Sequence, residues 1–216
     1  MMEVPTEKVI SFLDESFPDA KCSLAFSSPF ECLVAVMLSA QTTDESVNKI
    51  TPNFFRDFPS AFELAQTDIA LIENDIYSLG LYRNKAKNLL LMAKKLVELY
   101  SGEVPNDKAK LVCLPGVGNK TANVVLAECF KVPSFPVDTH VGRIAKRLGY
   151  ARSIDSPDII EKKLEKIFPR EQWIALHHRF IAFGRAICHS QNPDCLSCPL
   201  NSYCPYFKKA SSKTGK

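Results

Sequence analysis

The sequence predicts an all-α protein, and three observations favour this fold class. Apolar residues recur at helical spacing through most of the 216 residues. No segment shows the sustained apolar–polar alternation that is typical of a half-buried strand. The one tract rich in β-branched residues, Val132 to Val137, is short and is interrupted by Pro133 and Pro136. We therefore expect helices joined by loops.

Clear local signals predict three helices. Residues 30–40 are apolar almost all round, which predicts a buried central helix, and Pro29 suits its first turn. Residues 84–100 are amphipathic, with Lys and Glu outside the apolar stripe, and Gly102 lies where a C-terminal cap is expected. Ser156 and Pro157 open a third helix over 158–168, which Pro169 ends. The predicted stripe of the 84–100 helix comprises Ala86, Leu89, Leu90, Ala93, Leu96, Val97 and Tyr100.

A glycine-containing turn separates two further helical segments at residues 114–118, which read LPGVG. Pro115 ends the first helix at or before Leu114, and the second helix runs from about Asn119 to Phe130. Gly116 and Gly118 permit a tight turn with unusual φ angles. Such a turn exposes backbone N–H groups at a helix N-terminus, which suits a phosphate. A plain helix-to-helix turn is the alternative.

Lys120 and Asp138 are candidates for chemistry. Lys120 lies in the first turn of the 119–130 helix, on a face with Val124 and Ala127, so we expect partial burial. A nucleophilic amine must be neutral, so its pKa has to lie about 3 units below the ordinary value of about 10.4, a change of roughly 4 kcal/mol. The positive end of a helix supplies only about 0.3–1 kcal/mol of that free energy. The residues alone also allow a lysine that only contacts phosphate. Asp138 precedes a predicted helix over 139–148, as an N-cap or a catalytic carboxylate.

Eight cysteines fall into two groups. Four crowd the C-terminus with the spacing C-x6-C-x2-C-x5-C, which indicates metal ligation by an iron–sulfur cluster or zinc. These are Cys188, Cys195, Cys198 and Cys204. The other four lie among apolar residues, and we expect small buried side chains there. These are Cys22, Cys32, Cys113 and Cys129.

Composition and charge exclude a membrane protein and point to a polyanion. The longest apolar stretch, residues 33–38, is far shorter than a membrane span. We also recognise no signal peptide in the N-terminal residues. We therefore expect a cytoplasmic protein with reduced thiols. Residues 1–81, 82–152 and 153–216 carry net charges of −9, +8 and +4, within a total of +3. The basic middle suggests a surface for a polyanion, although solvated helix faces would give the same count. Residues 208–216 read as a disordered basic tail.

The motifs LPGVGNKTANVVL and VDTHVGRIAKRLG resemble the helix-hairpin-helix signature of the endonuclease III superfamily of DNA repair glycosylases. The resemblance covers nearly the whole chain. It implies a two-lobed glycosylase fold, with a six-helix barrel domain over residues 22–132 and a [4Fe–4S] cluster domain over 1–21 and 133–216. It implies a monomer that acts on double-stranded DNA holding a damaged base or abasic site, with the flipped nucleotide bound between the lobes.

The same resemblance implies roles for individual residues. Lys120 matches the nucleophile and Asp138 the catalytic aspartate of a glycosylase that also nicks abasic sites by β-elimination. The four C-terminal cysteines match the [4Fe–4S] ligands. The implied DNA contacts are Gln41, Leu81, Leu114, Gly116, Gly118 and His140, of which Gln41 and Leu81 fill the gap left by the flipped nucleotide. Two departures reduce the basic charge: relatives often have Arg where Asn119 stands, and residues 189–194 contain no Lys or Arg.

Three other functions compete with this interpretation. Adenine-mismatch relatives lack the nucleophilic lysine and have a glutamate within the 30–40 helix, whereas this chain has Lys120 and no acid over 32–40. A non-catalytic helix-hairpin-helix module would need neither Lys120 nor Asp138, and a cluster-bearing redox protein would not need the hairpin. Oxidised pyrimidines are the damaged bases that the resemblance leads us to expect.

Overall fold

The computed structural model describes residues 3–214, with side chains to residue 211, and this range contains helices and no strand. The all-α prediction is therefore confirmed. The chain divides into two compact units, one over Cys22–Val132 and the other over Met1–Lys21 with Pro133–Lys216. Each unit encloses a hydrophobic core of its own. No helix in the described range is both long and apolar enough to cross a membrane.

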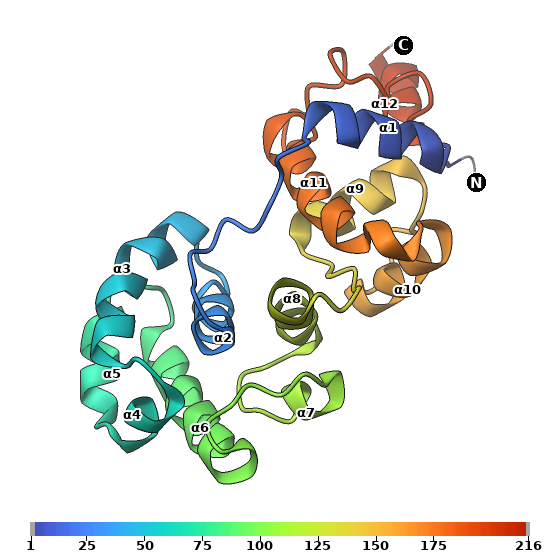
Figure 1. Ribbon diagram of the computed structural model, residues 1–216. Coiled ribbons are helices and arrows are strands. Elements are labelled where there is room, and N and C mark those ends of the chain that lie inside the picture. Colours follow the sequence, from blue (N-terminus) through green and yellow to red (C-terminus); the bar gives the residue numbers. More distant parts are fainter. Residues whose placement is uncertain (1–2, 215–216) are drawn as a thin grey trace. The chain divides into compact units, whose positions relative to one another are not determined.

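The unit over Cys22–Val132 is built around one apolar helix. Its elements are α2 (Pro29–Leu38), α3 (Asp44–Asp57), α4 (Ala61–Gln66), α5 (Ile69–Ile76), α6 (Tyr82–Tyr100), α7 (Lys108–Val112) and α8 (Asn119–Phe130) (Figure 1). Helix α2 packs against α3, α6 and α8, which explains why it is apolar nearly all round. The Ser28 hydroxyl caps it by accepting from Glu31 N at 3.2 Å, and Pro29 occupies its first position.

Helix α6 begins two residues before the predicted start. Its N-cap is Leu81, which has a left-handed backbone (φ 60°) and provides no side-chain cap, so no ordinary capping signal marks the boundary. At its other end Ser101 and Gly102 are both left-handed, and Gly102 N donates to Leu96 O at 2.9 Å. The predicted role of Gly102 in ending the helix is confirmed.

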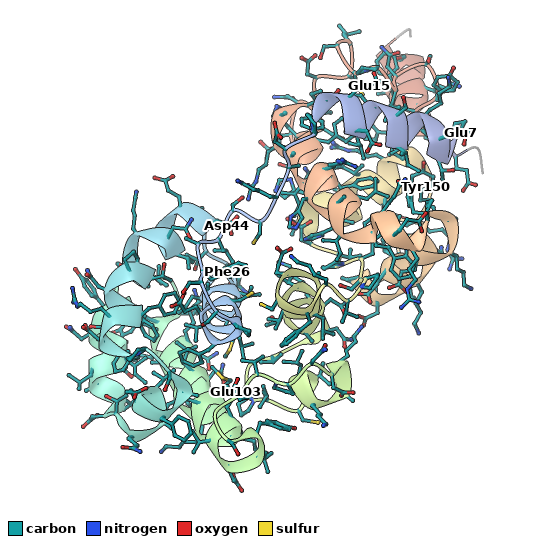
Figure 2. All side chains as sticks on the ribbon, in the orientation of Figure 1. Glu7, Glu15, Phe26, Asp44, Glu103 and Tyr150 are labelled. Carbon is teal, nitrogen blue, oxygen red and sulfur yellow. The ribbon has the colours of Figure 1, made fainter. Side chains whose placement is uncertain are left out.

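The second unit combines the N-terminal helix with the C-terminal part of the chain. Its elements are α1 (Thr6–Ser16), α9 (Thr139–Leu148), α10 (Pro157–Ile167), the 3-10 helix η1 (Arg170–Gln172), α11 (Trp173–Ala186) and α12 (Pro205–Thr214) (Figure 1). Helix α11 packs against α1 and α9. The buried Tyr150, labelled in Figure 2, donates its hydroxyl to Val4 O at 2.7 Å and so fastens the N-terminal segment to this unit.

The prediction of a disordered tail from Lys208 is wrong for the described residues, because α12 extends to Thr214. Two aromatic residues at its start explain the helix. Phe207 packs against the core of the second unit, and the Arg147 guanidinium lies 4.4 Å from the centre of the Tyr206 ring. Residues 215–216 lie outside the described range.

Candidate functional site

The predicted hairpin is a tight turn between α7 and α8. Val117 N donates to Leu114 O at 3.1 Å, Pro115 occupies the second position, and Gly116 has φ 77°, which together define a type II turn. A side chain at Gly116 would also place its Cβ 2.8 Å from Asn88 Cβ. Glycine is therefore required here both by backbone conformation and by close packing.

The hairpin is anchored by two apolar side chains and presents backbone to solvent. Leu114 and Val117 are buried, so Leu114 can contact a ligand only through its main chain. Gly118 is exposed and forms the N-cap of α8 without a side-chain cap. The first amide groups of a helix have no partner within the helix, so this end of α8 suits an anion.

Lys120 lies in the first turn of α8, as predicted, but its side chain is exposed. The expectation of partial burial is therefore wrong. Val124 and Ala127, which share its face of the helix, are buried, whereas the first turn lies at the end of the helix, where the packing stops. The protein itself therefore leaves this amine in contact with solvent, and any desolvation has to come from a bound ligand.

Asp138 is the N-cap of α9, and this part of the prediction is confirmed. Its Oδ1 accepts a hydrogen bond from Val141 N at 2.8 Å, and the residue is half-buried. The bond fixes the carboxylate relative to the helix. Lys120 belongs to the unit over Cys22–Val132 and Asp138 to the other unit.

His140 lies in the first turn of α9 and is half-buried. Its Nδ1 lies 3.0 Å from Arg143 Nη2, and a Cβ added at Gly184 would come within 2.6 Å of the same nitrogen. Burial lowers the pKa of His140, and the charges of Arg143 and Arg185 act in the same direction, while Asp138 opposes them. The lowered pKa favours the uncharged imidazole, which can donate only one hydrogen bond.

Gln41 and Leu81 lie on the same cavity, although they are 40 positions apart in the sequence. Both are exposed and both have a left-handed backbone, with φ 54° and 60°. The cavity has an empty volume of about 600 Å³, part of it open to solvent, and Gly116 of the hairpin also lines it. The structure thus places three of the predicted DNA contacts around one hollow of one unit.

Lys85 lines the same cavity, and the prediction from the sequence missed it. The sequence pattern placed the lysines of α6 outside the apolar stripe, whereas Lys85 is only 8% exposed. Burial lowers the pKa of its ammonium group. The available signal was spacing, because Lys85 precedes the buried Leu89 by four positions and the buried Met92 by seven.

The four C-terminal cysteines line a second cavity, within the other unit. Its empty volume is about 350 Å³, part of it open to solvent, and the four residues are Cys188, Cys195, Cys198 and Cys204. Burial raises the pKa of the Cys198 thiol to about 11, and the neighbouring cysteines of the group add to this effect. Within the described residues, no group of three or more His, Cys, Asp or Glu side chains could hold a single metal ion.

Two arginines of α9 bind the segment that begins at Cys188. Arg143 Nε donates to Cys188 O at 3.1 Å. Arg147 donates to Cys188 Sγ at 3.2 Å, to His189 O at 2.6 Å and to Ser190 O at 3.0 Å. These are hydrogen bonds from charged donors, which are stronger than neutral ones. Helix α9 therefore carries Asp138 at its start and the cysteine segment along its side.

The remaining cysteines follow the prediction only in part. Cys32 is buried in the core, Cys129 is half-buried and packs against that core, and Cys22 is half-buried. Cys113 is exposed, so the prediction of a buried side chain is wrong there. It is the C-cap of the short helix α7 and lies at the turn into the hairpin, where the chain runs along the surface.

Comparison with known proteins gives the class to which these features belong. The model of the HhH-GPD superfamily base excision DNA repair proteins matches residues 34–170. That stretch contains the hairpin, Lys120 and Asp138.

Relatives with 40–47% identity over most of the chain share one family within this class. The chain is 47% identical to endonuclease III of Bacillus subtilis (strain 168) over 93% of the chain and 92% of that protein, and 40% identical to endonuclease III of Escherichia coli (strain K12) over 94% and 95%. A solved structure of a trapped endonuclease III–DNA covalent intermediate, an estranged-adenine complex, superposes with a TM-score of 0.92 at 47% identity, over 95% of this chain and 97% of that one. The chain belongs to the endonuclease III family of base excision DNA repair proteins.

Proposed function

We propose that the protein removes damaged bases from duplex DNA and then nicks the resulting abasic site, as a DNA glycosylase and abasic-site lyase. One observation supports this best. The exposed Lys120 lies in the first turn of α8, which follows the Leu114–Val117 turn, and no side chain caps the N-terminus of this helix. The backbone amides of that turn suit a DNA phosphate, and the amine stands beside them. A binding module alone would not need the amine.

The reaction assigns one role to each polar group. The neutral Lys120 amine attacks C1′ of the damaged nucleotide, the C1′–N bond breaks, and the base leaves with a proton. Asp138, held by its bond to Val141 N, stabilises the positive charge that develops on the sugar and assists proton transfer. The C1′–O4′ bond then breaks and O4′ takes up a proton, which leaves a protonated Schiff base between C1′ and the lysine nitrogen. Loss of a 2′ proton from this Schiff base breaks the 3′ C–O bond by β-elimination, with the 3′ phosphate as the leaving group. Because Lys120 is exposed in the free protein, bound DNA has to supply the desolvation that favours the neutral amine.

The proposed DNA contacts divide into two kinds. The main chain of Leu114, Gly116 and Gly118 holds phosphate, which positions the duplex without selecting a base. Gln41 and Leu81 enter the base stack beside the extruded nucleotide, where an exposed apolar side chain such as Leu81 replaces lost stacking. We place His140 against the DNA as a neutral donor. In this proposal Cys22–Val132 is the six-helix barrel domain, and the protein works in the cytoplasm, where bacterial DNA lies.

Borohydride trapping tests the chemistry. Wild-type protein mixed with abasic duplex DNA and borohydride should give a covalent adduct, because the reductant fixes a Schiff base. Lys120→Gln should give none. Lys131→Gln is the matched control, since Lys131 is an exposed lysine at the other end of α8, and it should trap as wild type does. Absence of an adduct with wild-type protein contradicts the proposal, as does an adduct that survives Lys120→Gln.

The four cysteines around the second cavity would hold a [4Fe–4S] cluster. Four thiols on one cavity provide the donor set that such a cluster uses, and Arg147 offers a charged hydrogen bond to Cys188 Sγ. When bound, the cluster ties the C-terminal segment together, and none of the glycosidic chemistry depends on it. Iron and acid-labile sulfide in equal amounts in the purified protein support this assignment. Zinc in place of iron contradicts it.

The substrate preference follows from the family alone, and we propose oxidised pyrimidines. Single-turnover excision across duplexes that each carry one lesion, including oxidised pyrimidines, 8-oxoguanine and mismatched adenine or thymine, measures it directly. Preferred excision of a mismatched normal base would instead indicate a mismatch-specific glycosylase. Trapping on abasic DNA is independent of this choice, so the two parts of the proposal are tested separately.

A further inference from the structure

Gln41 and Leu81 both adopt a backbone conformation that side-chain-bearing residues avoid. Their φ angles of 54° and 60° lie in the left-handed region, which is strained for residues other than glycine and persists only where the surroundings determine it. Both side chains are exposed, so their own packing does not hold them. Another part of the unit has to fix the two loops.

Lys85 contacts both loops, one through its side chain and the other through its main chain. Its Nζ donates to Thr42 Oγ1 at 2.5 Å, across 43 positions of the sequence, and Thr42 directly follows Gln41. The same hydroxyl donates back to Ala40 O at 3.3 Å, which closes a small turn around Gln41. On the main chain, Lys85 N donates to Leu81 O at 3.0 Å, the first hydrogen bond of α6. One residue thus contacts the loop of Gln41 and the loop of Leu81.

A lysine in this position is costly unless its charge has a use. Lys85 is 8% exposed, and within the described residues no acidic side chain forms an ion pair with it. An apolar side chain would fill the same space without desolvating an ammonium group, so packing alone does not account for a lysine here. What an ammonium adds is a strong, directed hydrogen bond to Thr42, beside the cavity that Gln41, Leu81 and Gly116 also line.

We propose that Lys85 is a positioning residue that holds Gln41 and Leu81 in their DNA-inserting conformation through its hydrogen bond to Thr42. This inference rests on the proposed function, because it assumes that these two residues enter the DNA stack. Lys85 itself needs no contact with the reacting atoms. Its loss should therefore weaken binding and base displacement, while the rate of Schiff base formation at saturating DNA stays close to that of wild type.

The sharpest test changes the acceptor rather than the lysine. Thr42→Val removes the hydroxyl at nearly constant volume, whereas Thr42→Ser keeps it. With a duplex that carries a non-cleavable abasic analogue opposite 2-aminopurine, Thr42→Val should bind about tenfold more weakly, the size of one charge-assisted hydrogen bond, and should show a smaller rise in 2-aminopurine fluorescence. Thr42→Ser should match wild type in both measurements.

Variants of the lysine complete the test. Lys85→Met should show the same defects, and adding Thr42→Val to it should cause no further loss, because the two residues act through one bond. Lys94→Met, an exposed lysine of the same helix, controls for lost charge. If Lys85→Met does not fold, as thermal unfolding would reveal, the Thr42 pair still decides. Wild-type binding by Thr42→Val, or an equal defect in Thr42→Ser, overturns the inference, whereas failure of wild type to trap abasic DNA overturns the proposed function instead.

Discussion

Asp138 has a structural and a proposed chemical role, and two substitutions separate them. Its Oδ1 caps α9 through Val141 N at 2.8 Å. Asn caps a helix about as well as Asp, so Asp138→Asn loses only the interaction of a charge with the helix dipole, about 0.3–1 kcal/mol. Asp138→Ala also loses the capping bond, which brings the total to about 1–2 kcal/mol. For a chain of this length, each kcal/mol corresponds to about 2–4 °C in Tm.

Activity should respond differently from stability. Both variants lack the carboxylate, so both should lose at least about 100-fold in the rate of base excision, the range that positioned acid–base groups contribute. Single-turnover excision at saturating DNA and thermal unfolding measure the two effects in the same samples. Ser156→Ala is the control, because Ser156 caps α10 in the same way, through Ile159 N at 3.4 Å, and it should lower Tm without changing the rate. Wild-type excision by Asp138→Asn would reduce Asp138 to a helix cap and refute its catalytic role.

Three further predictions follow from individual contacts. Gly116→Ala should lower the free energy of unfolding by about 2–4 kcal/mol in denaturant titrations, because residue 116 has φ 77° and its new Cβ would lie 2.8 Å from a side-chain carbon of α6. An unchanged denaturation midpoint would contradict the packing of the hairpin. Gly184→Ala should displace the His140 ring, because the new Cβ would lie 2.6 Å from its Nδ1. DNA binding should weaken while the helix content measured by circular dichroism stays unchanged, and wild-type affinity would argue against a DNA contact by His140. The hydrogen bond from Lys163 lowers the pKa of Asp155 to about 2 from 3.8. This carboxylate therefore stabilises the fold above about pH 4, and the stabilisation is lost as the pH falls toward 2. Asp155→Asn should flatten the dependence of Tm on pH between these two values.

The sequence predicted helices best where strong local signals mark their ends. The bounds of α8 and α9 match the predicted ranges 119–130 and 139–148, because a Pro-Gly turn and an Asp cap mark the two starts. The start of α6 was predicted two residues late, because Leu81 caps the helix by its backbone conformation alone. The helix over Pro205–Thr214 was missed, because its stability depends on packing of Phe207 against a distant core.

Side-chain environments were harder to predict than helices. The exposure of Lys120 and the burial of Lys85 both depend on tertiary packing, and helical periodicity placed each of them in the wrong environment. Periodicity identifies a face of a helix, but it does not show where along the helix the packing ends, or that a lysine can reach a hydroxyl 43 positions away. The cysteine pattern was informative because its spacing is local, and all four residues line one cavity.

The hydrogen bonds of α9 to Cys188, His189 and Ser190 have a consequence for synthesis of the chain. Arg143 and Arg147 leave the ribosome long before the three residues whose carbonyl oxygens they bind. A nascent chain, or one shortened by an early stop codon, therefore contains the whole of α9 and the carboxylate at its start but leaves both guanidinium groups without those acceptors. A later part of the polypeptide thus completes the surroundings of a helix that begins 49 residues before Cys188.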